Sequence, residues 1–323
     1  MEGSRFPFPV SGVVLFGSRA DDSFTPDSDI DLLVVAENIN PKLHRRKKEM
    51  LVLKRLFPVK PLDLLLLTPD EVVSNFTNHN PLFLDIAEDG IIIADSENFL
   101  SDLIEETREY IRVRGIKRVK DGWQFPVTYR AATALSGVSN KDFAEAMLKD
   151  GERDLSIGKN LLRDEFFDKS VYHFQQSVEK CIKSILVAFG NFKKTHFVGE
   201  VLAEVVPDQS LPDEWEKKLT EIAEISEELE PEVSLSRYPG IINNALWMPS
   251  EEYGRQEAEE SFKKAELVLN AAKDFNKYWF PECEEQEQLQ EEEPTSPDTH
   301  KDETPSGQVR KQNKTHSKRL PGP

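Results

Sequence analysis

The stretch from Phe16 to Val35, "FGSRADDSFTPDSDIDLLVV", limits most narrowly what this chain can fold into. It places Gly17 and Ser18 directly after one apolar run, and Asp29 and Asp31 at the head of the next. Alternate side chains of a strand point to opposite faces, so the two aspartates share one face. The pattern predicts a strand, a polar loop and a second strand that together carry a chemical site.

Short apolar runs alternate with helical stretches over the first hundred residues, which predicts a small α/β (α+β) domain with a mixed sheet. The runs predicted to be strands are Gly12–Phe16, Ile30–Val35, Pro61–Leu67 and Gly90–Asp95. A helix is expected over Lys42–Phe57, and its basic part is interpreted as a solvated face. A second helix is expected to start at Thr68, with Pro69 as its first residue and Glu71 completing a capping box.

Asp63 supplies a third carboxylate, inside the apolar run Pro61–Leu67. A charge buried there is costly unless it is paired or metal-bound. If this run lies beside the strand of Asp29 and Asp31, three carboxylates meet at one edge of the sheet. Oxygen ligands are what Mg²⁺ prefers, and two such ions support phosphoryl chemistry. The three aspartates are therefore the predicted metal ligands and catalytic residues.

The residues after the first strand are suited to binding phosphate. Gly17 allows backbone N–H groups to approach closely, Ser18 adds a hydroxyl donor, and Arg19 adds a charge. Together with the aspartates, this set resembles the minimal nucleotidyltransferases of the DNA polymerase β-like superfamily. Their motif is Gly-Ser, a loop, Asp-x-Asp on the next strand and a third Asp on a later strand. This chain departs from it by reading "GSRADD" where small members often read "GSRARG".

The resemblance implies magnesium-dependent transfer of a nucleoside monophosphate from an NTP to a hydroxyl acceptor, with AMP from ATP as the expected case. It assigns two Mg²⁺ ions to Asp29, Asp31 and Asp63, and the nucleotide to Gly17, Ser18 and Arg19. The acceptor it implies is a protein, a small molecule or an RNA end. The formal net charge of −18 disfavours long RNA, although it does not exclude a local basic cleft.

Helical patterns dominate the second half of the chain. A basic helical connector is expected from Ser101 to about Pro126, and an all-α bundle without strands from Lys141 to Trp279. Asp168 is the expected N-cap of the helix that ends at Gly190. Apolar residues recur along that helix at three- and four-residue spacing: Val171, Phe174, Val178, Ile182, Ile185 and Phe189.

The segment "YHFQQSVEKCIKSILVAFG" resembles HEPN domains, which are small helical bundles often fused to minimal nucleotidyltransferases. The residues that carry the resemblance are His173, Gln175, Gln176, Glu179, Lys180, Lys183 and Gly190. No histidine of the bundle follows an arginine at the four-to-six-residue spacing of HEPN ribonucleases. His173 is interpreted as a packing residue and His196 as a helix-start residue, while Glu179 and Lys183 are placed to pair.

The predicted domains are 1–100 (nucleotidyltransferase), 101–140 (connector), 141–280 (HEPN-like bundle) and 281–323 (disordered tail, because it has few large apolar residues). The chain has two cysteines and neither a signal-peptide pattern nor an apolar run of membrane-span length, so a cytoplasmic location without a membrane is expected. A homodimer through the helical domain is a further hypothesis. Two alternatives stay open: a non-catalytic nucleotide-binding protein, and a HEPN-type ribonuclease or toxin–antitoxin-like fusion.

Overall fold

A computed structural model describes residues 6–56, 61–242 and 244–281. Apart from Pro281, the tail predicted to be disordered lies outside the described residues. Within them no helix is both long and apolar enough to cross a membrane.

The N-terminal sheet has four strands in the order β3-β2-β1-β4. They are β1 (Val10–Phe16), β2 (Ile30–Ala36), β3 (Leu62–Leu67) and β4 (Ile91–Asp95). β1 pairs antiparallel with β2 and β4, whereas β2 and β3 run parallel. The prediction of a mixed sheet is confirmed, and each strand differs from its predicted range by at most a few end residues.

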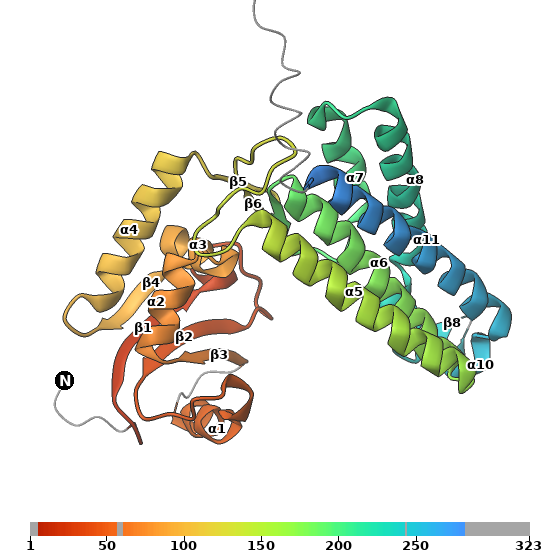
Figure 1. The fold of residues 1–323 in the computed structure, drawn as a ribbon. Helices are drawn as coiled ribbons and strands as arrows, with labels where there is room; N and C mark the ends of the chain where they lie inside the picture. The colour runs from red at the N-terminus through yellow and green to blue at the C-terminus, as the bar shows by residue number, and fades with distance from the viewer. Residues whose placement is uncertain (1–5, 57–60, 243, 282–323) are drawn as a thin grey trace, which may run out of the picture. The chain divides into compact units, whose positions relative to one another are not determined.

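Helices cover both faces of this sheet (Figure 1). On one face, Leu33 and Leu67 pack under α2 (Pro69–Thr77), α3 (Pro81–Asp89) and α4 (Phe99–Arg114). On the other, Leu32, Val34, Leu64 and Leu66 pack with Leu53 of α1 (Lys47–Leu56). Because side chains alternate along a strand, Asp31 and Asp63 share the face of Leu33 and Leu67.

Local signals placed the helix starts of this domain with mixed success. The capping box is confirmed: Thr68 Oγ1 accepts from Glu71 N (3.3 Å), and Glu71 Oε2 accepts from Thr68 N (2.9 Å). The interpretation of the basic run before α1 as a solvated face is wrong for Arg46, which is fully buried. Arg46 forms an ion pair with Glu71 across the sheet edge.

The connector is helical only to Arg114, the last residue of α4. Gly115 follows as the C-cap, with φ +66°. Beyond it, β5 (Lys117–Val119) and β6 (Gly122–Gln124) form an antiparallel sheet with β7 (Asn191–Lys193) from the second half of the chain. Trp123 is buried at the centre of the adjoining apolar cluster. Burial of this side chain beside a distant strand explains why a local helix prediction failed here.

The bundle is built around α6 (Phe167–Ala188), which packs between α5 (Asn140–Arg163) and α11 (Arg255–Trp279). α8 (Asp213–Leu229) and the shorter α7 (Gly199–Val205), α9 (Glu232–Leu235) and α10 (Pro249–Glu252) complete it. All six periodic apolar residues predicted for α6 are buried, and Gly190 adopts φ +80° after the helix as predicted.

Two expectations for the bundle are wrong. α6 begins with Phe166 at its N-cap position, so Asp168 is not the cap; it lies buried in the first turn, with an ion pair to Lys169 (2.9 Å). The bundle also contains strands: β7, and the hairpin of β8 (Gly240–Ile242) and β9 (Ala245–Trp247). These three-residue strands are too short for an alternating pattern to reveal them.

Candidate functional site

Two of the three predicted aspartates lie side by side at the start of neighbouring strands. Asp31 of β2 is the register partner of Asp63 in the parallel strand β3, where strands are about 4.8 Å apart. The backbone N–H of Ile30 donates to Pro61 O (3.0 Å), which fixes this end of the pair. Asp29 directly precedes β2.

The carboxylates influence one another electrostatically. The pKa of Asp31 is raised, first by partial burial and then by the negative charges of Asp63 and Asp29. Asp63 is exposed, and its Oδ1 accepts from the backbone N–H of Leu64 (2.9 Å). The premise that Asp63 is buried in its strand is therefore wrong, although its position beside Asp31 is as the hypothesis required.

A hard divalent cation suits this donor set, because carboxylate oxygens that repel one another gain most from a shared positive charge. Their arrangement is not that of a preformed metal site. Within the described part of the chain, no group of three or more His, Cys, Asp or Glu side chains is placed to hold an ion.

Gly17 packs directly on the Asp31 carboxylate. It opens the short 3₁₀ turn Gly17–Arg19 with φ +72°, a left-handed conformation that favours glycine. A Cβ at this position would lie 2.3 Å from Asp31 Oδ2. Glycine is therefore required here by both the backbone conformation and the approach of the carboxylate.

Replacing Gly17 with alanine is expected to lower any activity of the site by about ten- to a hundredfold. Left-handed backbone costs a non-glycine residue about 1–2 kcal/mol, and the new methyl group would displace the Asp31 side chain. Steady-state rates of the purified variant measure the loss. Gly115→Ala is the control, since Gly115 also has positive φ but a Cβ added there would meet no atom within 4 Å. Equal losses in both variants would contradict the role given to Gly17.

Arg19 secures the loop that leads to the aspartates. Its Nε and Nη2 donate to the carbonyl oxygen of Ser28 (3.1 and 2.8 Å), and its guanidinium lies 5.2 Å from the ring centroid of Phe24. Both ends of the loop are therefore tied together immediately before Asp29. Ser18 is half-buried in the same turn as Gly17.

The polar residues predicted from the HEPN resemblance form two networks on α6. Glu179, buried, accepts from Lys183 (2.9 Å) and pairs with His196 Nδ1 (3.0 Å), so the pairing of Glu179 with Lys183 is confirmed. His173 Nδ1 pairs with Asp154 Oδ1 (2.8 Å). Each imidazole is thus oriented by a buried carboxylate, which goes beyond packing or helix initiation.

A further polar cluster was not found from the sequence. Asp85 of α3 accepts from Trp123 Nε1 (3.1 Å) and pairs with Lys194, and Arg118 of β5 lies 3.6 Å from it. Arg118 also pairs with Asp89 (2.5 Å). Only the basic composition of residues 112–120 and the Lys193-Lys194 pair hinted at it.

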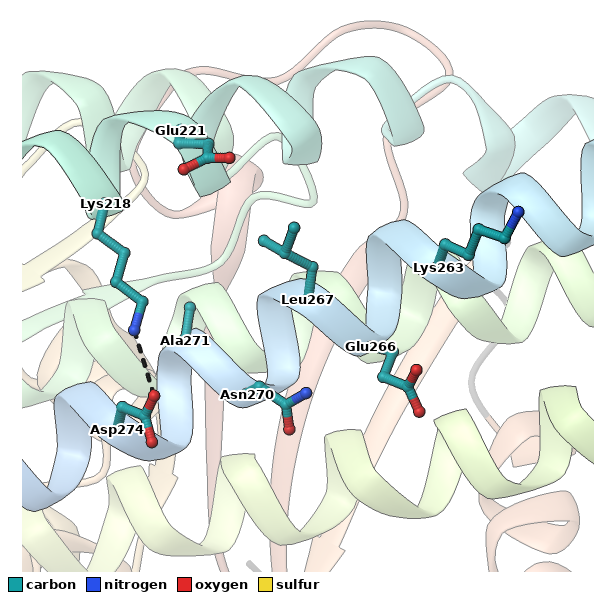
Figure 2. Close-up of a pocket in the computed structure, with 8 residues that line it drawn as sticks. All are labelled: Lys218, Glu221, Lys263, Glu266, Leu267, Asn270, Ala271 and Asp274. Carbon is teal, nitrogen blue, oxygen red and sulfur yellow. Dashed lines mark hydrogen bonds and ion pairs between the residues drawn. The ribbon is translucent and has the colours of Figure 1, made fainter.

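A cavity of about 450 Å³ lies between α8 and α11, apart from the residues described above (Figure 2). Its walls are mainly charged, and Lys218 and Asp274 form an ion pair across it (3.2 Å). None of the residues predicted from the sequence lies there.

Comparison with known protein families defines the class of each half. Residues 3–93 match the nucleotidyltransferase domain family, and residues 144–275 match the HEPN domain family. The chain therefore carries a nucleotidyltransferase domain fused to a HEPN domain.

Individual relatives resemble larger or smaller parts of it. A Methanocaldococcus jannaschii protein named "Putative toxin MJ1304" is 38% identical over 138 residues, which are 43% of this chain and 91% of the relative. A nucleotidyltransferase-like protein from Exiguobacterium sibiricum has a TM-score of 0.38 at 15% identity, covering 85% of this chain and 73% of that one. Spectinomycin adenyltransferase AAD(9) from Enterococcus faecialis, solved with ATP and spectinomycin, has a TM-score of 0.29 at 14% identity, covering 82% and 92%.

Proposed function

We propose that this protein transfers a nucleoside monophosphate, AMP in the expected case, from an NTP to a hydroxyl acceptor. One observation carries the proposal. Asp31 lies in register beside Asp63, and Gly17 packs on the carboxylate of Asp31. This arrangement lies within residues that match the nucleotidyltransferase family.

In this proposal Asp29, Asp31 and Asp63 would hold Mg²⁺, with two ions in the full complement. Bound Mg²⁺ neutralises phosphate charge and polarises the phosphorus–oxygen bonds. The backbone of Gly17 and the hydroxyl of Ser18 donate to the β- and γ-phosphates. Arg19 would add charge to the same phosphates, from the position in which it holds the loop end before Asp29.

The bond changes follow from this placement. The acceptor oxygen forms a bond to the α-phosphorus, the bond from that phosphorus to the bridging oxygen breaks, and pyrophosphate leaves. Asp63, which is exposed and lies in register beside Asp31, takes up the acceptor proton. Positioning and charge neutralisation supply most of the rate, as in phosphoryl transfer generally. The HEPN domain would contribute to choosing the acceptor, a protein or a small molecule before RNA.

ATP labelled at the α-phosphate is expected to label an acceptor in a cell lysate, whereas ATP labelled at the γ-phosphate is not. The difference follows because the α-phosphorus stays with the product and the γ-phosphorus leaves in pyrophosphate. Chelation of divalent ions should abolish the label and added Mg²⁺ restore it. Transfer of the γ-label would indicate a kinase instead, and binding of ATP without transfer would indicate a non-catalytic nucleotide-binding protein.

A HEPN-type ribonuclease is the second candidate function, favoured by the two imidazoles oriented by Asp154 and Glu179. Such pairs can act in general acid–base catalysis. RNA cleavage that persists in the double variant Asp29→Asn with Asp31→Asn, and fails in His196→Ala, would support it.

A further inference from the structure

An open cavity of about 430 Å³ lies where the small three-stranded sheet adjoins α3. Arg118, Lys194 and Thr195 line it with donors, and Asp85 and Asp121 add carboxylates. Arg118 comes from β5 of the connector, and Lys194 directly follows β7 of the helical half. Arg118 and Lys194 are 76 residues apart in the sequence.

The pairing register sorts the lysines and arginines of this sheet onto two faces. Arg118 is opposite Trp123, and Trp123 is opposite Phe192, so these three share the inner face. Lys194 lies two residues after Phe192 and returns to that face. Lys117 and Lys193 lie on the outer face, and no ion pair to a carboxylate within the described residues holds either of them.

Asp85 and Asp89 hold the two inner cations in place without enclosing them. Arg118 contacts both carboxylates, and Lys194 contacts Asp85. Their side chains remain 44% and 53% exposed. A guanidinium has five N–H donors and an ammonium three, so donors remain for a ligand. Because the side chains are already ordered, binding an anion costs them little further entropy.

The helix that holds this pair, α3, also contacts the Gly-Ser turn. Asp21 lies just after that turn, and its backbone N–H donates to Gly17 O (3.3 Å). The pKa of Asp21 is lowered, first by hydrogen bonds from the Ser23 side chain and backbone, and also by the positive charges of Arg118 and Lys194. α3 therefore contacts both the Gly-Ser turn and, through Asp85 and Asp89, the two cations.

We propose that Arg118 and Lys194 bind the outer phosphates of the nucleotide, with Asp85 as their positioning residue. The inference rests on the proposed nucleotidyl transfer and adds a phosphate-binding element that the Gly-Ser motif does not contain. The guanidinium of Arg118 and the ammonium of Lys194 can form charge-assisted hydrogen bonds with a triphosphate and with the pyrophosphate that leaves. The connector and the helical half would then each contribute one residue to the nucleotide site.

The chain offers matched controls at adjacent positions. Arg118→Met and Lys194→Met remove the inner cations, while Lys117→Met and Lys193→Met remove outer ones from the same strands. We expect each inner variant to raise the Kd for MgATP and the KM for ATP by about ten- to a hundredfold, the range for hydrogen bonds to charged groups. Each outer variant should change them by less than about twofold. Calorimetric titration of the full chain gives Kd, and the α-label assay gives KM.

Three outcomes would overturn the inference. Equal Kd values for inner and outer variants would mean that the inner face does not bind phosphate. A lower Tm for both inner variants with unchanged Kd would show that Arg118 and Lys194 are structural links. Wild-type protein that neither binds MgATP nor transfers label would overturn the proposed function itself, and this inference with it. If Arg118→Met does not fold, Lys194→Met carries the test, since Lys194 lies at the end of its strand.

Discussion

Asparagine in place of Asp31 is expected to reduce nucleotidyl transfer by at least about a thousandfold while leaving the fold intact. The amide removes the charge that would bind Mg²⁺ and stabilise the transferring phosphate, and such electrostatic terms dominate this chemistry. The fold should tolerate the change because the pKa of Asp31 is already raised by burial and by Asp63 and Asp29, so losing this charge relieves repulsion. Single-turnover transfer of the α-label and thermal unfolding measure the two effects.

Asp27→Asn is the matched control, since Asp27 is an exposed residue of the loop that precedes β2. It should retain nearly full activity. Asp63→Asn should resemble Asp31→Asn, because the two residues are register partners. An Asp31→Asn variant that keeps more than about a tenth of wild-type activity would contradict the proposed metal-binding role and leave the site without a mechanism.

Methionine in place of Arg46 is expected to lower the free energy of unfolding by about 2–4 kcal/mol, because a fully buried guanidinium loses its hydrogen bonds while Glu71, 32% exposed, can be partly solvated. Arg46 is 0% exposed and donates to Asn40 O (2.6 Å), Leu66 O (2.9 Å) and both carboxylate oxygens of Glu71. Its loss would leave buried carbonyl groups and a carboxylate without their partner. Urea unfolding measures the change.

Arg45→Met provides the control, because Arg45 is the exposed neighbour of Arg46. This substitution should lower the free energy of unfolding by less than about 0.5 kcal/mol.

The destabilisation expected for Arg46→Met also depends on pH. Hydrogen bonds from Arg46, above all other causes, lower the pKa of Glu71 from 4.5. A lowered folded-state pKa contributes stability that is present above pH 4.5 and is lost as the pH falls through the folded value. The difference in the free energy of unfolding between wild type and Arg46→Met should therefore become smaller in acid. A difference that grows in acid would contradict the pairing of Arg46 with Glu71.

Local patterns were sufficient for much of the fold because the relevant forces act between near neighbours. Short apolar runs located the four strands of the main sheet, and periodicity located α6, whose six predicted apolar residues are all buried. The Thr68 capping box was visible because both its hydrogen bonds join residues three apart. The site motif was visible for a similar reason, since Gly17 directly follows β1 and Asp31 lies in the next strand, β2.

Long-range packing determined the features that the patterns missed. Arg45 and Arg46 are chemically identical neighbours, and only the position of Glu71 makes one of them buried. Asp63 looked buried from its apolar neighbours, but it is exposed at the start of its strand. β5 and β6 depend on pairing with β7, which lies some seventy residues later in the sequence. A pattern read over a short stretch of sequence cannot detect such a pairing.

From its residues alone, this chain could be assigned a mixed-sheet nucleotidyltransferase domain followed by a HEPN bundle, because periodicity and short motifs are encoded within a few residues. Register and burial, in contrast, arise only when distant segments meet. They decide that Asp31 lies beside Asp63, that Arg118 and Lys194 share one face of the small sheet, and that Lys117 and Lys193 lie on the other face. Contacts between segments far apart in sequence have no local signature, since their free energy exists only in the folded chain.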